Sequence, residues 1–210
     1  MIISISGFIG SGKDTAADYL CERYGFQRHS FANNLKDAIS IVFGWDRELL
    51  EGLTPESRKW REEVDVWWAE KLHMPILTPR WVMQYWGTEL LRNKFHQDIW
   101  VYSLLNKLRN TKENIVITDC RFSNELLAIK QIDGMTVRVE RGSKPKWYND
   151  ALIFNKGPDE VGYLFAKSVL ERHNVHPSEY SSVGFNYNHV IQNNGTLEDL
   201  YEKIDSIVNL

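Results

Sequence analysis

The chain has few of the features that mark secreted, membrane or nucleic-acid-binding proteins. It contains only two cysteines, Cys21 and Cys120, which excludes a disulfide framework and indicates a reducing compartment. No apolar run reaches the roughly 18 residues that a membrane-spanning helix needs, and Met1 leads directly into a short apolar segment, not into a signal peptide. The formal net charge is −3, so the chain lacks the general basic field that nucleic-acid binding requires. We expect a soluble cytoplasmic protein without a membrane or nucleic-acid partner.

Internal repeats and low-complexity tracts are absent as well, which excludes solenoids and other repeat architectures. With 210 residues, 43% hydrophobic and 25% charged, the chain can form one substantial core with a smaller lobe appended. Strand-like and helix-like segments alternate, which is typical of an α/β protein with a five-stranded, mainly parallel sheet covered by helices on both faces. The predicted strands are residues 1–5, 27–32, 113–118, 135–141 and 189–193.

The stretch GFIGSGKDT, from Gly7 to Thr15, lies between the first predicted strand and a predicted helix. Its glycines and the lysine that follows them fit a phosphate-binding loop, in which backbone N–H groups surround a polyphosphate. Lys13 would reach the β- and γ-phosphates, and the Thr15 hydroxyl would help to hold Mg²⁺. Asp14 stands where a serine or threonine usually follows the lysine. The displaced hydroxyl resembles the loop of nucleoside monophosphate kinases more than that of GTPases.

Polar residues follow the apolar strand at 113–118. Asp119 comes directly after this strand, where phosphate-loop proteins place an acid associated with Mg²⁺. Arg121 lies just beyond, and together with Arg80 and Arg92 it forms a set of arginines that could grip a second phosphate. An acceptor phosphate is largely a dianion at neutral pH, so the predicted reaction needs no general base.

Two segments differ in composition from the rest of the chain. Residues 45–98 are rich in tryptophan, arginine and glutamate, and we expect a helical insert there that binds the acceptor. Its Thr-Pro pairs predict helices over about 55–72 and 79–94. Residues 142–173 contain several helix breakers and one clear helix from about residue 159, as in a mobile lid. The predicted core of this single domain comprises residues 1–44, 99–141 and 174–210.

These motifs together resemble the phage-type deoxynucleoside monophosphate kinases, which transfer the γ-phosphoryl group of ATP to a deoxynucleoside monophosphate. The resemblance extends over nearly the whole chain, and GTExxR combined with TDxRFxNE is more specific than the phosphate loop. It is carried by GFIGSGKDT (7–15), SFANNLKDA (30–38), TPRWVMQYWGTELLR (78–92), DIWV (98–101), ITDCRFSNE (117–125), HPSE (176–179) and VIQNNGT (190–196). It implies a P-loop kinase fold, ATP and Mg²⁺ as cofactors, and the host cytoplasm for a phage-encoded enzyme. It also suggests a homodimer.

The resemblance further implies roles for single residues. ATP would bind to Gly10, Ser11, Gly12, Lys13, Asp14 and Thr15. The acceptor nucleotide would bind to Phe31, Lys36, Arg80, Gln84, Gly87, Thr88, Arg92, Arg121 and Glu125. Catalysis would rest on Lys13, Arg92, Arg121 and Asp119, with Thr15 and Asp119 serving Mg²⁺ partly through water. Residues 193–196 would pack around the adenine in a supporting role.

The sequence leaves several alternatives open. Another small-molecule phosphate-loop kinase, such as a dephospho-coenzyme A kinase, would also have a final strand, an Asn-Gly turn and a helix like these. A kinase for a hydroxyl acceptor would need a base, for which Asp119 is the candidate. A nucleotide-gated binding module would keep the loop without transferring a phosphoryl group. Which bases are accepted is not evident, and Phe31, Tyr85 and Trp86 are candidates for excluding a ribose 2′-hydroxyl.

Overall fold

A computed structural model describes residues 1–209. The chain divides into two compact units. The first comprises residues 1–30 and 112–210, and the second comprises residues 31–111. The predicted insert, residues 45–98, lies within the second unit, which also includes the helices that precede and follow the insert.

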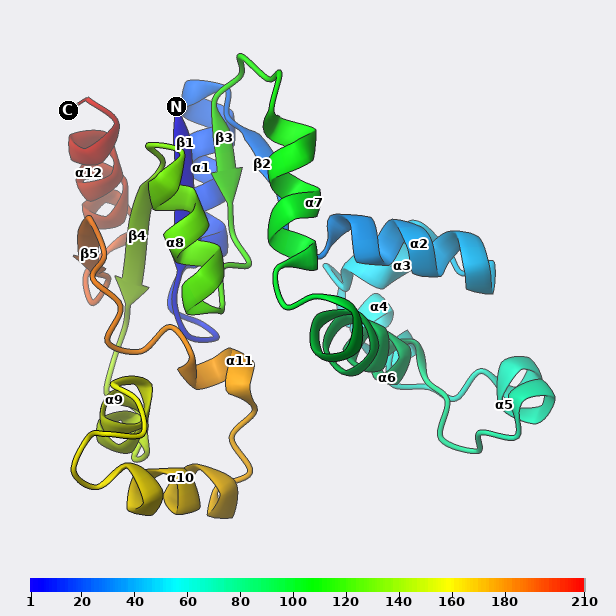
Figure 1. The fold of residues 1–210 in the computed structure, drawn as a ribbon. Helices are drawn as coiled ribbons and strands as arrows, with labels where there is room; N and C mark the ends of the chain where they lie inside the picture. Colours follow the sequence, from blue (N-terminus) through cyan, green and yellow to red (C-terminus); the bar gives the residue numbers. More distant parts are fainter. Residues whose placement is uncertain (210) are drawn as a thin grey trace. The chain divides into compact units, whose positions relative to one another are not determined.

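The first unit is built on a five-stranded sheet, which confirms the predicted fold class (Figure 1). The strands run in the order β2-β3-β1-β4-β5, and every neighbouring pair is parallel. They are β1 (Ile2–Ser6), β2 (Gln27–His29), β3 (Ile115–Ile117), β4 (Met135–Glu140) and β5 (His189–Gln192). The chain extends from β1 first to one side and later to the other, so the carboxyl end of β1 is the switch point where such sheets bind ligands.

The second strand is shorter than predicted. It ends at His29, which pairs with Ile117 at the end of β3. Since β2 is an edge strand and β3 is its only neighbour in the sheet, pairing stops where β3 stops.

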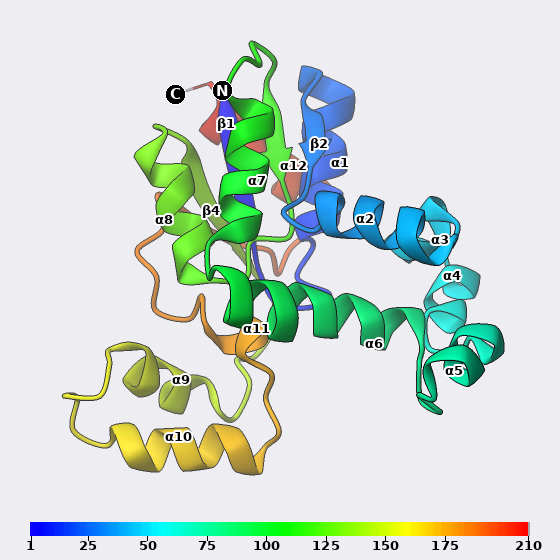
Figure 2. The same ribbon diagram turned by 45° about the vertical axis from the view of Figure 1, so that its right-hand side comes forward.

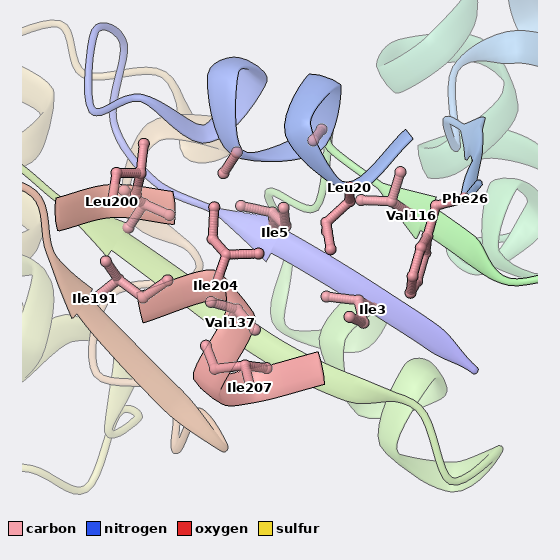
Figure 3. Packing of buried hydrophobic residues seen from close by; sticks show 13 residues of the cluster. Ile3, Ile5, Leu20, Phe26, Val116, Val137, Ile191, Leu200, Ile204 and Ile207 are labelled. Atoms are coloured by element: carbon pink, nitrogen blue, oxygen red, sulfur yellow. The ribbon is translucent and has the colours of Figure 1, made fainter. Parts of the chain in front are cut away.

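Helices cover both faces of this sheet. The α1 helix (Lys13–Tyr24) and the α12 helix (Leu197–Val208) pack on one face, where Ile5, Leu20 and Ile204 belong to one buried apolar cluster (Figure 3). The α8 helix (Ser123–Gln131) contacts β1 and β4. Successive strand residues point to opposite faces, and Ile3 and Ile5 of β1 and Val137 of β4 all point into the cluster in Figure 3.

Between β4 and β5 the chain forms α9 (Tyr148–Asn155), α10 (Tyr163–Arg172) and α11 (Pro177–Tyr180) (Figure 2). The expectation of one helix from about residue 159 was wrong, because α9 precedes Gly157 and Pro158. These helices have a small apolar core of their own, in which Tyr148, Ala151, Leu170 and Val183 are buried.

The second unit is helical within residues 31–111. Its elements are α2 (Asn33–Phe43), α3 (Arg47–Glu51), α4 (Pro55–Trp60), α5 (Val66–Leu72), α6 (Pro79–Gln84), the π-helix η1 (Tyr85–Phe95) and α7 (Ile99–Leu108). The predicted helix starts are confirmed, since the hydroxyls of Thr54 and Thr78 accept backbone N–H bonds and each is followed by proline.

Two predicted helices differ from the structure. The helix expected over 55–72 is interrupted after α4, and Asp65 starts α5 by accepting a 3.0 Å hydrogen bond from the backbone N–H of Trp68. The other carboxylate oxygen of Asp65 accepts from the indole N–H of Trp45 at 2.7 Å. The helix expected over 79–94 is continuous, but from Tyr85 it is a π-helix, in which hydrogen bonds join residues five apart.

Candidate active site

The predicted phosphate loop joins β1 to α1. Gly10 and Gly12 have φ angles of 78° and 97°, a left-handed conformation that favours glycine. The Ser11 N–H donates to the Phe8 carbonyl at 3.1 Å, and Gly12 is the residue that caps the start of α1. The loop therefore directs backbone and Lys13 towards the carboxyl end of the sheet, as anion binding at a helix N-terminus requires.

Asn193, the residue that directly follows β5, holds the phosphate loop in place. The buried Asn193 amide donates a 2.8 Å hydrogen bond to the backbone carbonyl of Ser11. A Cβ atom at Gly12 would collide with the same amide. Only glycine therefore fits at Gly12, and Asn193 supports the loop.

One pocket of this unit is lined by residues of the loop and of the sheet edge. Two of the predicted catalytic residues, Lys13 and Arg121, line it together. The Nη1 of Arg121 lies 3.9 Å from an oxygen of Glu179 in α11, while the Arg121 side chain is 55% exposed. The structure thus brings the loop lysine and the strand-end arginine to one pocket, which α11 also lines.

A third cation, Arg138 of β4, also lines this pocket. Sequence analysis did not select it, because a single charged residue within an apolar strand is easily taken for an edge residue. The signal was nevertheless present, because Val137 and Val139 flank it in a strand that is buried on both faces.

Asp119 follows β3 as predicted, and Thr118 separates it from the last strand residue. Its Oδ2 accepts a 2.6 Å hydrogen bond from the hydroxyl of Ser30. Thr15 lies in the first turn of α1 and is exposed. Residues 1–209 contain no cluster of three or more His, Cys, Asp or Glu side chains that could hold a metal ion.

Glu125 has a local structural contact that sequence analysis did not anticipate. It is 3% exposed, and its Oε2 accepts hydrogen bonds from the backbone N–H groups of Arg121 and Phe122 at 2.8 and 3.1 Å. The carboxylate thereby caps α8 and orients the backbone that carries Arg121. Burial, with the nearby carboxylates of Glu125 and Asp119, raises the pKa of the Cys120 thiol well above its usual value, so this thiol remains protonated.

Asp14, which occupies the unusual position after Lys13, forms ion pairs. Arg28 of β2 contacts Asp14, contacts Asp18 at 2.8 Å, and approaches the hydroxyl of Thr118 through Nε at 3.4 Å. Lys13 Nζ lies 3.5 Å from Asp14. Arg28, which sequence analysis also missed, therefore connects the loop helix with the ends of β2 and β3.

In the second unit, two of the predicted acceptor residues, Lys36 and Arg80, form local ion pairs. Lys36 binds the carboxylate of Glu51, which also pairs with Arg47. Burial favours the neutral carboxylic acid, but the hydrogen bonds from Lys36 and Arg47 outweigh this effect and lower the pKa of Glu51. Arg80 is exposed and its Nε lies 3.1 Å from Glu62. Gln84 ends α6 and is exposed.

The remaining acceptor residues lie on or near η1. Gly87 is buried, and a Cβ atom there would press on Leu35, while its carbonyl accepts a 2.9 Å hydrogen bond from Trp100. Arg92 lies in the same helix, and its Nη1 donates to the backbone carbonyl of Gln97 at 3.4 Å. Thr88 is half-buried. Phe31 at the start of the unit is 4% exposed.

Most of the tryptophans pack the second unit. Phe43 stacks on Trp45 at a centroid distance of 4.4 Å and contacts Trp68 and Trp86 edge-on at 4.9 and 5.4 Å. These tryptophans therefore form part of the packed interior of the second unit. Trp67 differs, because it is 57% exposed.

Comparisons with known proteins give the family. A model of deoxynucleotide monophosphate kinases matches residues 66–160. A protein of Acanthamoeba polyphaga mimivirus assigned to the same kinases is 31% identical over an alignment that covers 100% of this chain and 96% of that protein. The chain belongs to the deoxynucleotide monophosphate kinase family. The deoxynucleoside-5'-monophosphate kinase of Escherichia phage T5 is 24% identical, and the alignment covers 100% of this chain and 92% of that kinase.

Membership of the deoxynucleotide monophosphate kinase family confirms the resemblance inferred from the sequence motifs and implies the use of ATP. Among solved structures, shikimate kinase from Aquifex aeolicus aligns over 100% of this chain and 96% of its own, with 12% identity and a TM-score of 0.45. A structural similarity of this degree does not indicate which reaction this chain catalyses. Among residues 1–209, no helix of this family member has the length and apolar character needed to cross a membrane.

Proposed function

We propose that this chain transfers the γ-phosphoryl group of Mg-ATP to a deoxynucleoside monophosphate, giving ADP and the deoxynucleoside diphosphate. The observation that carries the proposal is the pocket that Lys13 and Arg121 line together. Lys13 belongs to a phosphate loop, and Arg121 belongs to TDxRFxNE, which together with GTExxR carries most of the resemblance to the family. Two cations from separate motifs at one pocket suit a reaction in which negative charge moves between two phosphates.

Transfer needs positioning and charge neutralisation more than proton removal. An oxygen of the acceptor phosphate forms a bond to the γ-phosphorus, and the bond from that phosphorus to the bridging oxygen breaks, leaving its electron pair on ADP. The acceptor is already largely a dianion at neutral pH, so no side chain has to deprotonate it. Lys13 and Arg121 neutralise the transferred group, and Arg92 of the second unit contributes when the acceptor is bound.

The donor and acceptor nucleotides use different residues. ATP phosphates bind the backbone of residues 10–15, which Asn193 supports through Ser11. The acceptor binds residues of the second unit, in particular Lys36, Arg80 and the face of η1. Base choice rests on the side chains around Gln84, whose exposed amide is able to hydrogen bond to a base edge.

Thr15 and Asp119 offer the oxygen ligands that Mg²⁺ prefers, and we assign them to the ion, partly through water. Mg²⁺ would add positive charge at the phosphates when bound. Ser30 orients the Asp119 carboxylate by its 2.6 Å hydrogen bond. Residues 142–173 close over the phosphates and exclude water, which limits hydrolysis of ATP. A homodimer is part of the proposal because of the family resemblance.

A substrate panel tests the proposal. ADP release is measured with each common deoxynucleoside monophosphate, with the matching ribonucleotides, and with dephospho-coenzyme A. We expect ADP release that depends on at least one deoxynucleoside monophosphate and is absent with dephospho-coenzyme A. Turnover with dephospho-coenzyme A alone would replace the proposed acceptor, and slow ATP hydrolysis that no monophosphate stimulates would indicate a binding module.

A further inference from the structure

Arg138 is the most deeply buried cation of the phosphate pocket. It lies on β4 beside Ser6, its side chain is 4% exposed, and it lines the pocket together with Lys13 and Arg121. We propose that the guanidinium of Arg138 is a further binding residue for the terminal phosphate of ATP. The inference rests on the proposed function, because it assumes that ATP is the phosphoryl donor.

The guanidinium is held firmly on most sides. Its Nε lies 3.0 Å from Glu140, and its Nη1 donates to the hydroxyl of Tyr187 at 3.4 Å. The rings of Phe8 and Tyr187 lie 4.9 and 5.6 Å from the guanidinium carbon. These contacts fix the planar group, so its position depends little on the flexible stem.

One donor of this fixed group remains for a ligand. Within residues 1–209, Nη2 of Arg138 is buried and has no hydrogen-bond partner. Buried donors are nearly always paired, because an unpaired one loses its hydration without compensation. An arginine offers five N–H donors and no acceptor. The missing partner is therefore an acceptor.

The charges around the pocket indicate that this acceptor is an anion. Lys13, Arg121 and Arg138 line the pocket, against the single carboxylate of Glu179. Gly7 and Phe8, at the start of the phosphate loop, line it as well. The loop lysine of such sites reaches the outer phosphates. The geometry therefore favours the terminal phosphate over the β-phosphate, which the loop backbone holds.

A purely structural role makes a different prediction. Phe8 packs edge-on against Trp147 and Tyr148 at centroid distances of 5.7 and 6.2 Å, while its ring also lies against Arg138. If Arg138 served only to support Phe8 and the loop, its replacement would lower the affinity for every nucleotide that binds to the loop. If Arg138 binds the terminal phosphate, its replacement lowers the affinity for ATP and leaves the affinity for ADP unchanged.

The test compares the dissociation constants of ATP and ADP by calorimetry, without an acceptor, in the full chain and in R138M and R138K. R138M keeps the aliphatic stem and removes the charge. We expect ATP to bind about 10-fold to 100-fold more weakly to R138M, as for loss of one charge-assisted hydrogen bond, and ADP to change by less than about threefold. R138K keeps the positive charge but lacks the planar guanidinium group, and it should still bind ATP more weakly than the wild type does.

The matched control is K130M. Lys130 also lies against an aromatic ring, at 5.3 Å from the Phe185 centroid, but it is on α8 and outside the pocket. K130M should leave both dissociation constants unchanged. Equal losses of ATP and ADP affinity in R138M, unchanged ATP affinity, or full recovery of ATP binding in R138K would each overturn the proposal.

If the variants do not fold, an NMR measurement on the wild-type protein tests the same proposal. With ¹⁵N-labelled arginine, ATP should shift the exchange-protected guanidinium signals of Arg138 and ADP should not. Identical spectra with both nucleotides would contradict the proposal. Neither experiment contains a monophosphate, so both remain decisive about Arg138 if the substrate panel fails, and the panel remains decisive about the acceptor if Arg138 proves structural.

Discussion

The side-chain amide of Asn193 donates a 2.8 Å hydrogen bond to the main-chain carbonyl of Ser11. The two residues are far apart in the sequence, yet Asn193 directly follows β5 and Ser11 lies in the phosphate loop. The last strand of the sheet thus holds the loop that the first strand begins. This contact makes the shape of the phosphate loop depend on the carboxyl-terminal part of the chain.

Replacing Asn193 by alanine should weaken ATP binding about 10-fold, because the loop loses a buried hydrogen bond and gains freedom. Calorimetric titration with ATP measures the effect. Asn188 provides a matched control, because its side-chain oxygen accepts hydrogen bonds from Thr136 near the start of β4. An N188A variant should lose stability but retain ATP affinity. An N193A variant with wild-type ATP affinity would show that the loop keeps its shape unaided.

Glu125 should act by holding the backbone of Arg121 and not through its negative charge. A glutamine retains an oxygen that can accept from the N–H groups of Arg121 and Phe122, so E125Q should keep most of the activity. E125A leaves both donors without this partner and should lower kcat about 10-fold or more. Steady-state kinetics with varied monophosphate distinguishes the two roles. A large rise in KM for the monophosphate in E125Q would indicate direct contact with the acceptor.

The Glu51 carboxylate makes the stability of the second unit depend on pH. Although burial opposes ionisation, hydrogen bonds from Lys36 and Arg47 lower the pKa of Glu51 in the folded protein. A lowered folded pKa contributes stability above the unfolded value of about 4.3 and loses it as the pH falls through the folded pKa. E51Q should therefore be less stable than the wild type by about 1 kcal/mol at pH 7 and equally stable in acid.

Tryptophan fluorescence follows this unfolding selectively, because seven of the eight tryptophans lie within residues 31–111. Denaturant titrations of wild type and E51Q are compared at several pH values. A stability difference that persists unchanged below the folded pKa of Glu51 would rule out the ion pairs as its origin.

Discrimination against ribose should depend on Tyr85 more than on its aromatic neighbours. Tyr85 is 40% exposed and stacks on Trp81 at 5.0 Å, whereas Trp86 packs against Phe43 and Phe31 is buried. Y85A should raise kcat/KM for ribonucleotides relative to deoxynucleotides by about 10-fold, because removing the ring makes room for a hydroxyl. Competition assays with paired substrates measure the ratio. Unchanged ratios in Y85A and in trimmed variants of Phe31 and Trp86 would exclude an aromatic gate at these positions.

The sequence predicted the parallel sheet and the phosphate loop because both follow from local patterns. Apolar runs mark the buried strands, and the spacing from Gly7 to Lys13 is fixed by the shape of the loop. The helix break before Asp65 was missed because the carboxylate's bond to the Trp45 indole is a contact distant in sequence. The π-helix from Tyr85 was missed because α-helix periodicity alone gives no sign of it.

In the candidate site, too, residues in local motifs were predicted and residues defined by contacts distant in sequence were missed. Lys13, Asp119 and Arg121 lie in recognisable motifs, and Lys13 and Arg121 line one pocket. Arg138 and Arg28 belong to no motif, and each contacts a residue distant in sequence, Phe8 of the phosphate loop for Arg138 and Asp14 of α1 for Arg28. The contact between Asn193 and Ser11 could not be read from either segment alone.

The most direct test of the central claim measures ADP and deoxynucleoside diphosphate in the same reaction, for the wild type, K13A and R121A. R109A and K203A, which change exposed cations outside the pocket, are the matched controls. We predict one diphosphate for each ADP in the wild type and the controls, and a kcat at least about 100-fold lower in folded K13A and R121A. Near-normal turnover in either variant, or ADP formed without the diphosphate in the wild type, would contradict the account.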